Sequence, residues 1–172
     1  MRISINAKTA NAILRLPAIV ILALLILWHF VFDNVAVYRS ISLAPGTVNQ
    51  RFRLNYSGDY RMGIEVERKF RHPVLQCLLG ITGTELLDSS VCKDNPAVLK
   101  YSWQLTCDGS LIRTGSSDHI DGGAYTTDTM EAQFGTFEGK RGDHCHLALT
   151  FLGDASKLSV ANPKLRIYIE LL

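Results

Sequence analysis

Residues 16–32 form an apolar block of seventeen residues, LPAIVILALLILWHFVF, without a single charged side chain. A helix needs about 20 mostly apolar residues to cross the hydrocarbon core of a membrane. The block reaches that length when it is counted back to Ala12, with the charged end of Arg15 extending toward the lipid headgroups. We therefore expect Leu16–Phe32 to lie in a lipid bilayer as a transmembrane helix.

Cations flank this block asymmetrically, since Arg2, Lys8 and Arg15 precede it and Asp33 follows it. The positive-inside rule then places the N-terminus in the cytoplasm and the rest of the chain on the far side of the membrane. A cleavable signal peptide is the alternative. We favour an uncleaved single-pass anchor, because the apolar core exceeds the usual ~7–15 residues and no clean small-x-small cleavage site follows it.

These features divide the chain into a cytoplasmic N-terminus (1–11), a transmembrane helix (12–33) and an outer domain (34–172). From Asn34 onward, fifteen cations balance fifteen anions. A neutral domain offers no electrostatic footprint for nucleic acid, so we expect no nucleic-acid partner.

Four cysteines, Cys77, Cys92, Cys107 and Cys145, all follow the apolar block. An even number in an oxidising compartment indicates two disulfides, for which three connectivities are possible. Cys107 and Cys145 share the parity of the bulky residues around them, so both thiols should point into one core. Cys77 and Cys92 bracket a short local segment. We therefore predict the pairs Cys107–Cys145 and Cys77–Cys92, and no zinc site, since no C-x-x-C pair is present.

Apolar and polar residues alternate through most of the outer domain, which is the pattern of half-buried β-strands. About eight strands are expected, at 35–43, 48–56, 60–66, 99–107, 111–115, 130–138, 145–152 and 165–171. Their spacing predicts an all-β fold, an antiparallel β-sandwich of the immunoglobulin-like or jelly-roll-like kind. Little helix is expected outside the anchor.

Three segments interrupt the strands. His72-Pro73 ends the strand before it, and the apolar segment 74–81 predicts one or two helical turns that carry Cys77. The polar segments 88–95 and 116–129 are expected to be loops. Asp108-Gly109 predicts a tight hairpin turn.

A further hairpin is expected where Ser57-Gly58-Asp59 separates two alternating runs whose apolar residues all have even numbers. This pairing places Arg51 opposite Glu65 on the solvent face of the sheet. Glu67 shares the outward parity of Glu65. We interpret this face as a solvated, charge-paired surface and not as an anion site.

His144-Cys145-His146 places two imidazoles on one face of a predicted strand, a spacing that can chelate a metal ion. No third ligand is evident beyond the adjacent Asp143 and the more distant His119. We therefore predict two exposed strand histidines, no metal site and no other cofactor.

Ser116-Ser117-Asp118-His119 contains the residue types of a hydrolase triad. Sequence neighbours rarely form a triad, and the chain has no G-x-S-x-G motif. The segment 116–129 is instead the best candidate for contact with a partner, because it is a long loop on a rigid scaffold. Within it, the predicted contact residues are Asp118, His119, Asp121 and Tyr125.

The segment FGTFEGKRGDHCHLAL (134–149), followed by Gly153-Asp154-Ala155 and by NPKLRI (162–167), resembles the closing strands of a known type of protein. This type comprises uncharacterised, envelope-anchored β-sandwich proteins of Gram-negative bacteria, and SLAPG (42–46) fits it too. Some such proteins are immunity partners that block toxins delivered to the periplasm. The resemblance implies an envelope location, with the outer domain (34–172) in the periplasm, and no catalytic residues. In this type of protein an aromatic residue usually follows the glycine that precedes the strand, whereas this chain has His144 and His146 there.

We therefore expect a non-enzymatic, single-pass inner-membrane protein that presents a disulfide-stabilised β-sandwich to a protein partner in the periplasm. An immunity protein is the specific form of this hypothesis. One alternative is a structural or assembly component of an envelope secretion or pilus complex. A second alternative is a metal-dependent or serine-dependent envelope hydrolase.

Overall fold

The computed structural model describes residues 20–21, 34–81, 90–117 and 122–169. No helix among these residues is long and apolar enough to cross a membrane. The predicted anchor lies outside the described residues except for Val20 and Ile21, as do Asp118, His119 and Asp121. The β-domain, which begins at Val35, is one compact unit.

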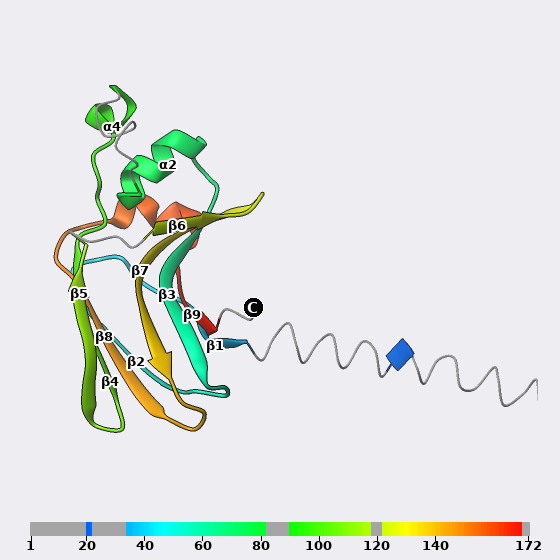
Figure 1. The fold of residues 1–172 in the computed structure, drawn as a ribbon. Coiled ribbons are helices and arrows are strands. Elements are labelled where there is room, and N and C mark those ends of the chain that lie inside the picture. Colours follow the sequence, from blue (N-terminus) through cyan, green and yellow to red (C-terminus); the bar gives the residue numbers. More distant parts are fainter. Residues whose placement is uncertain (1–19, 22–33, 82–89, 118–121, 170–172) are drawn as a thin grey trace, which may run out of the picture. The chain divides into compact units, whose positions relative to one another are not determined.

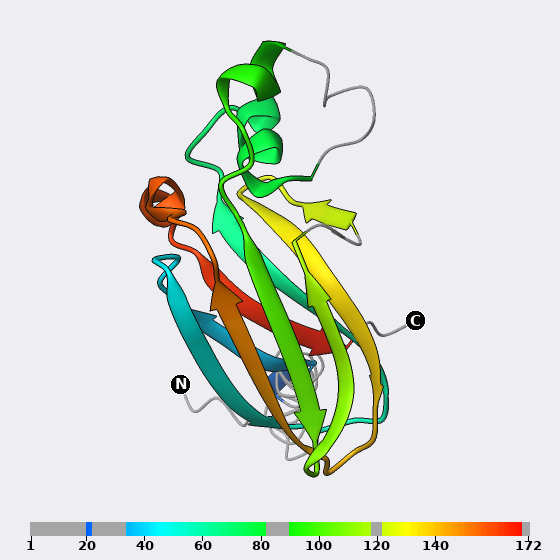
Figure 2. The same cartoon turned by 90° about the vertical axis from the view of Figure 1, so that its left-hand side faces the viewer.

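Nine strands in the described part of the chain form two antiparallel sheets (Figures 1 and 2). Sheet A has the order β1-β9-β3-β7-β6, and sheet B has the order β2-β8-β4-β5. The strands of sheet A are β1 (Val35–Ser40), β9 (Lys164–Ile169), β3 (Gly58–Glu67), β7 (Thr129–Gly139) and β6 (Gly122–Tyr125). Those of sheet B are β2 (Gly46–Arg53), β8 (His144–Phe151), β4 (Tyr101–Cys107) and β5 (Ser110–Ser116). The predicted all-β, antiparallel sandwich is confirmed.

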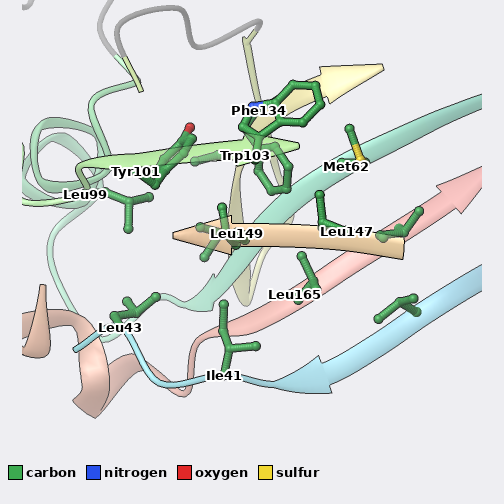
Figure 3. Packing of buried hydrophobic residues seen from close by; sticks show 14 of the residues in the cluster. Ile41, Leu43, Met62, Leu99, Tyr101, Trp103, Phe134, Leu147, Leu149 and Leu165 are labelled. Atoms are coloured by element: carbon green, nitrogen blue, oxygen red, sulfur yellow. The ribbon is translucent and has the colours of Figure 1, made fainter. Parts of the chain in front are cut away.

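Alternate residues of the two sheets fill one core between them (Figure 3). The even-numbered residues of β3 from Tyr60 to Val66 are almost fully buried, as are the odd-numbered residues of β8 from Cys145 to Phe151. Aromatic rings join the sheets, because Phe134 of β7 lies 5.6 Å from Tyr101 and 5.7 Å from Trp103 of β4, measured between ring centroids. The period-2 pattern therefore identifies the inward face of these strands correctly.

The predicted hairpin across Ser57-Gly58-Asp59 is wrong. β2 pairs with β8 in sheet B, whereas β3 pairs with β7 and β9 in sheet A. The chain after Arg53 therefore crosses from one sheet to the other. Leu54, which is 1% exposed, is fixed at this crossing by backbone hydrogen bonds to Gly142 and Asp143 of the turn between β7 and β8. In a hairpin and in a crossing between sheets alike, the even-numbered apolar residues of both strands point inward. Parity alone therefore does not separate the two arrangements.

The predicted hairpin across Asp108-Gly109 is confirmed, since β4 and β5 pair through the register Cys107↔Ser110. Asp108 and Gly109 both have positive φ, at 48° and 79°. Two central residues with positive φ form the type I′ turn that matches the right-handed twist of paired strands. The Asp-Gly dipeptide therefore sets this register locally.

The predicted helical turns are helix α2 (His72–Leu79), which has Pro73 in its first turn. Gly80 ends the helix in the left-handed conformation, with φ 76°. Leu75, Leu78 and Leu79 are fully buried, so α2 covers one end of the sandwich core.

Two predicted loops contain regular structure that the sequence did not reveal. The segment 88–95 carries a short helix, α4 (Ser90–Asp94), and 116–129 carries strand β6. β6 pairs with the start of β7 through Tyr125↔Met130 and Gly122↔Gln133. Both elements are short, and β6 is rich in glycine, so neither has a periodic pattern long enough to recognise.

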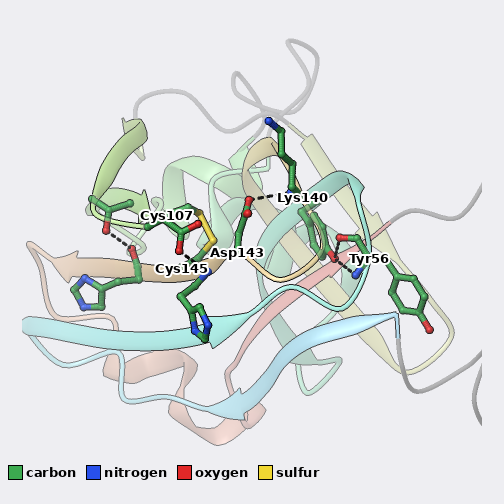
Figure 4. Close-up of a disulfide and its surroundings, with 10 residues drawn as sticks. Tyr56, Cys107, Lys140, Asp143 and Cys145 are labelled. Atoms are coloured by element: carbon green, nitrogen blue, oxygen red, sulfur yellow. Dashed lines mark hydrogen bonds between the residues drawn. A yellow bond between two sulfur atoms is a disulfide. The ribbon is translucent and has the colours of Figure 1, made fainter.

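Both predicted disulfides are present, Cys77–Cys92 and Cys107–Cys145. The first joins α2 to α4. The second joins directly opposed residues of β4 and β8, whose Cα atoms are 4.0 Å apart, and both cysteines are buried (Figure 4). Strand parity, together with the short separation of Cys77 and Cys92, therefore identified this cross-strand pair.

Candidate functional site

The candidate site is an open groove on the outer face of sheet B, at the end where β2 ends and β8 begins. Its volume is about 580 Å³, and it is lined by Arg51, Phe52, Arg53, Thr106, Gly109, His144, Cys145 and His146. We call it the basic groove.

Strand register builds the basic groove. Arg51 lies opposite His146, and Arg53 lies opposite His144, so two cations of β2 face two imidazoles of β8. All four residues have the outward parity of their strands, and the alternate residues Phe52 and Cys145 are buried beneath them. The groove is therefore a direct product of the β2–β8 pairing.

The basic groove contains no carboxylate among its lining residues. Within the described part of the chain, neither the Arg51 nor the Arg53 guanidinium has a hydrogen-bond or ion-pair partner. The ring of His146 is held by Asn49, whose Oδ1 lies 3.1 Å from Nε2. Asp108 in the β4–β5 turn is held at this end of the groove, where its Oδ1 accepts the backbone N–H of His144 at 3.1 Å. The groove therefore presents exposed positive charge to solvent.

Sequence reasoning missed this site because it paired Arg51 with Glu65. In the structure these residues belong to different sheets, and Arg51 instead lies beside a histidine. The charge-paired interpretation of this face is therefore wrong. The signal that finds the groove is the shared outward parity of Arg51, Arg53, His144 and His146, once β2 is paired with β8.

The outer face of sheet B continues from the basic groove as a strip of small polar residues. A second shallow hollow on it is lined mainly by hydroxyl, amide and small side chains, including Ser102, Gln104, Thr114 and Thr150. Thr150 shares a hydroxyl hydrogen bond of 2.9 Å with Thr47 of β2. Figure 2 shows this face toward the viewer, and none of the described elements covers it.

The histidine pair is an unfavourable setting for a metal cation. The described residues contain no group of three or more metal-ligating side chains. Arg51 and Arg53 also lie directly across the strand pair, where their positive charges oppose a bound cation. The groove favours an anion instead.

Of the predicted partner-contact residues, the structure describes only Tyr125. Its side chain is 70% exposed at the end of β6, and its ring meets His72 of α2 edge-on at 5.3 Å between centroids. Its role in partner contact stays a prediction.

A second cluster of charges lies on the outer face of sheet A. Arg166 Nη1 donates to Glu65 Oε2 at 3.2 Å and to Glu131 Oε2 at 3.1 Å. Tyr38 Oη donates to Glu65 Oε1 at 2.7 Å. Glu65 is only 7% exposed, so the expectation that it lies in solvent is wrong. Its neighbours across the sheet on β9 and β1 provide the burial.

Glu67 does lie near solvent. It accepts a hydrogen bond of 2.8 Å from Asn162 and forms an ion pair of 3.1 Å with Lys69. These two contacts, the first being the stronger, lower the pKa of Glu67 below its ordinary value. It therefore remains ionised at neutral pH.

Glu131 is the most deeply buried charged residue described, at 2% exposure. Its Oε1 has no hydrogen-bond partner and lies over Gly63, where no side chain could fit. Burial is the main cause that raises the pKa of Glu131, and the nearby Glu65 raises it further, whereas Arg166 lowers it. A carboxyl with a raised pKa is a feature of many acid–base catalysts, but Glu131 is too enclosed to reach a substrate. We interpret this cluster as structural.

No protein-family model matches the chain. No curated protein matches it either. Among solved structures, the chain is similar to a crystal structure of a protein from Sulfurospirillum deleyianum, with a TM-score of 0.55 and 14% sequence identity. The similarity covers 79% of this chain and 98% of that chain. At this identity the likeness shows the fold alone.

Proposed function

We propose that this chain is a non-enzymatic, membrane-anchored protein of the periplasm that binds a protein partner through the outer face of sheet B. The observation that carries the proposal is the exposure of this face. It spans four strands, no described element covers it, and one end holds two guanidinium groups that no described side chain neutralises. A partner gains contacts there without displacing any described element of the fold.

The proposed compartment is supported by the cysteines and by the N-terminal apolar block. Both disulfides join residues beyond that block, and disulfides persist in oxidising compartments. Three cations before the block and an acidic residue after it favour a cytoplasmic N-terminus. Proteolysis of intact spheroplasts should remove the β-domain, and an unchanged full-length band would contradict the proposed orientation.

The immunity hypothesis is the specific form of this proposal. Its support is the resemblance of 134–149 and 162–167 to envelope-anchored proteins that include toxin-immunity partners. It predicts that deleting the gene sensitises cells to attack by sister cells. Unchanged sensitivity would rule out the immunity form and leave a role in an envelope assembly.

Site-specific photo-crosslinking tests the proposed binding surface. A photoreactive amino acid replaces Gln104, an exposed residue on the outer face of sheet B, in the full chain in its own membrane. The matched control carries the same amino acid at Lys157, an exposed residue of the short 3₁₀ helix 156–161. We expect a discrete adduct from position 104 and none from position 157. Equal labelling from both positions, or none from either, would contradict the proposal.

A further inference from the structure

The arginines of the basic groove differ from the other strand arginines of the β-domain. The four others within described strands each have a polar acceptor. These are Arg39 with Gln50, Arg61 with Gln133, Arg113 with the backbone oxygen of Thr136, and Arg166 with Glu65 and Glu131. Arg51 and Arg53 lack one among the described residues. The other strand arginines are therefore engaged in hydrogen bonds or ion pairs within the fold, whereas the guanidinium groups of Arg51 and Arg53 can bind a ligand.

In the basic groove, the two pairs Arg51–His146 and Arg53–His144 lie side by side. Residues two apart on a strand are separated by ~7 Å, and neighbouring strands by ~5 Å. Four nitrogen-bearing side chains thus point outward from a small area of β2 and β8. Guanidinium groups bind carboxylates through paired, charge-assisted hydrogen bonds, so this spacing fits two or more carboxylates of one ligand.

The polar strip beside the basic groove indicates how long that ligand is. β8 has eight residues, which corresponds to ~26 Å of strand. Beyond the basic groove, the outer side of β8 carries small and hydroxyl-bearing residues, which are flanked by Asn49, Ser102 and Gln104. A single phosphate or lipid headgroup would use only the basic end. A protein segment uses the whole length, with carboxylates at one end and neutral hydrogen-bonding groups at the other.

We infer that the outer face of sheet B binds a carboxylate-rich segment of a partner protein, with Arg51 and Arg53 as its anchoring residues. This inference rests on the proposed function and names the partner's chemistry. It also makes binding depend on salt, because ionic strength screens exposed charges.

The test uses the full chain in a non-ionic detergent and a defined probe. The probe is a fluorescent sixteen-residue peptide of alternating glutamate and alanine, and binding is followed by fluorescence anisotropy. A peptide with glutamine in place of glutamate is the uncharged control. We expect the acidic peptide to bind, the glutamine peptide not to bind, and the affinity to fall as salt rises from 50 to 300 mM.

Charge-reversal variants test the anchoring residues. R51E/R53E should weaken binding of the acidic peptide at least about tenfold, because the partner's carboxylates then meet like charges. K93E/K157E changes the net charge equally on exposed residues of α4 and of the 3₁₀ helix, outside the strands of sheet B, and we expect less than about a twofold effect. Equal effects of the two variants would show non-specific attraction and overturn the inference. The R51Q/R53Q variant keeps long polar side chains and so controls for loss of folding. Its affinity for the acidic peptide should lie between those of the wild type and R51E/R53E.

Competition separates a protein ligand from other anions. Inorganic phosphate and dihexanoyl phosphatidylglycerol, at equal ionic strength, should displace the acidic peptide weakly. If either binds the groove while the acidic peptide does not, the site is an anion or lipid site and the inference fails.

Failure of this inference is distinguishable from failure of the proposed function. If the photo-crosslink at position 104 persists in R51E/R53E, the face binds a partner whose chemistry is not acidic. If the crosslink is absent in the wild type, the face itself is not the binding surface.

Discussion

Glycine at position 63 is required by the carboxyl group of a neighbouring strand. A Cβ at Gly63 would collide with the side chain of Glu131, which lies across it toward Arg166. The G63A variant must therefore displace a buried carboxylate from its ion pair, and we expect a loss of about 1–3 kcal/mol in the free energy of unfolding. Urea denaturation followed by tryptophan fluorescence measures it. Gly153, whose nearest side-chain atom is 3.8 Å from an added Cβ, is the matched control, and G153A should change stability little.

Glu131 should make the stability of the fold pH-dependent. Its pKa is raised in the folded state, so the folded protein binds this proton more tightly than the unfolded chain does. The stabilising contribution is fully present below the unfolded pKa near 4.5 and is lost as pH rises through the raised folded pKa. We expect E131Q to gain stability relative to wild type as pH increases from 4 to 8. Parallel stability curves for the two proteins would contradict a buried, proton-binding Glu131.

The two disulfides should contribute unequally to the stability of the fold. Cys77–Cys92 closes 15 residues and joins two helices, whereas Cys107–Cys145 closes 38 residues and joins two core strands. Loop-closure entropy gives roughly 3 kcal/mol for the shorter loop and roughly 4 kcal/mol for the longer one. We therefore expect C107A/C145A to lower the melting temperature more than C77A/C92A, as measured by circular dichroism. The reverse order would show that the α2–α4 segment limits unfolding.

Alternation of apolar and polar residues predicts some features of this fold and cannot predict others. Alternation identified the inward residues of β3, β4 and β8 and the Cys107–Cys145 pair, because these depend on strand periodicity. The Asp108-Gly109 turn and the Cys77–Cys92 pair followed from local turn chemistry and short sequence separation. Alternation failed where two arrangements have the same parity. The segment from Arg53 to Gly58 reads equally well as a hairpin and as a crossing between sheets, and only the partners of β2 and β3 decide. The basic groove was hidden by that error, since it exists only in the β2–β8 pairing.

Strand β7 contains a bulge that changes which of its residues face the core of the sandwich. Its partner β3 pairs Met62 with Gly135 and Gly63 with Gln133, which leaves Phe134 as an extra residue. Inward residues of β7 therefore switch from even to odd numbers after this bulge, as the burial of Phe137 shows. The sequence predicts the strand but not the bulge, because the bulge depends on the register with β3.

The bulge also places Phe134 where it joins the two sheets, so it should control the cooperativity of the sandwich. Its ring is 1% exposed and packs against Tyr101 and Trp103 of sheet B. F134A leaves a cavity between the sheets, and we expect it to lower the free energy of unfolding by about 3–5 kcal/mol while unfolding stays a single transition. Calorimetry and tryptophan fluorescence together measure both quantities. Leu152, which is 63% exposed, supplies the control, and L152A should change stability by less than about 0.5 kcal/mol. Two separate transitions in F134A would mean that each sheet keeps its structure alone, against the single shared core seen here.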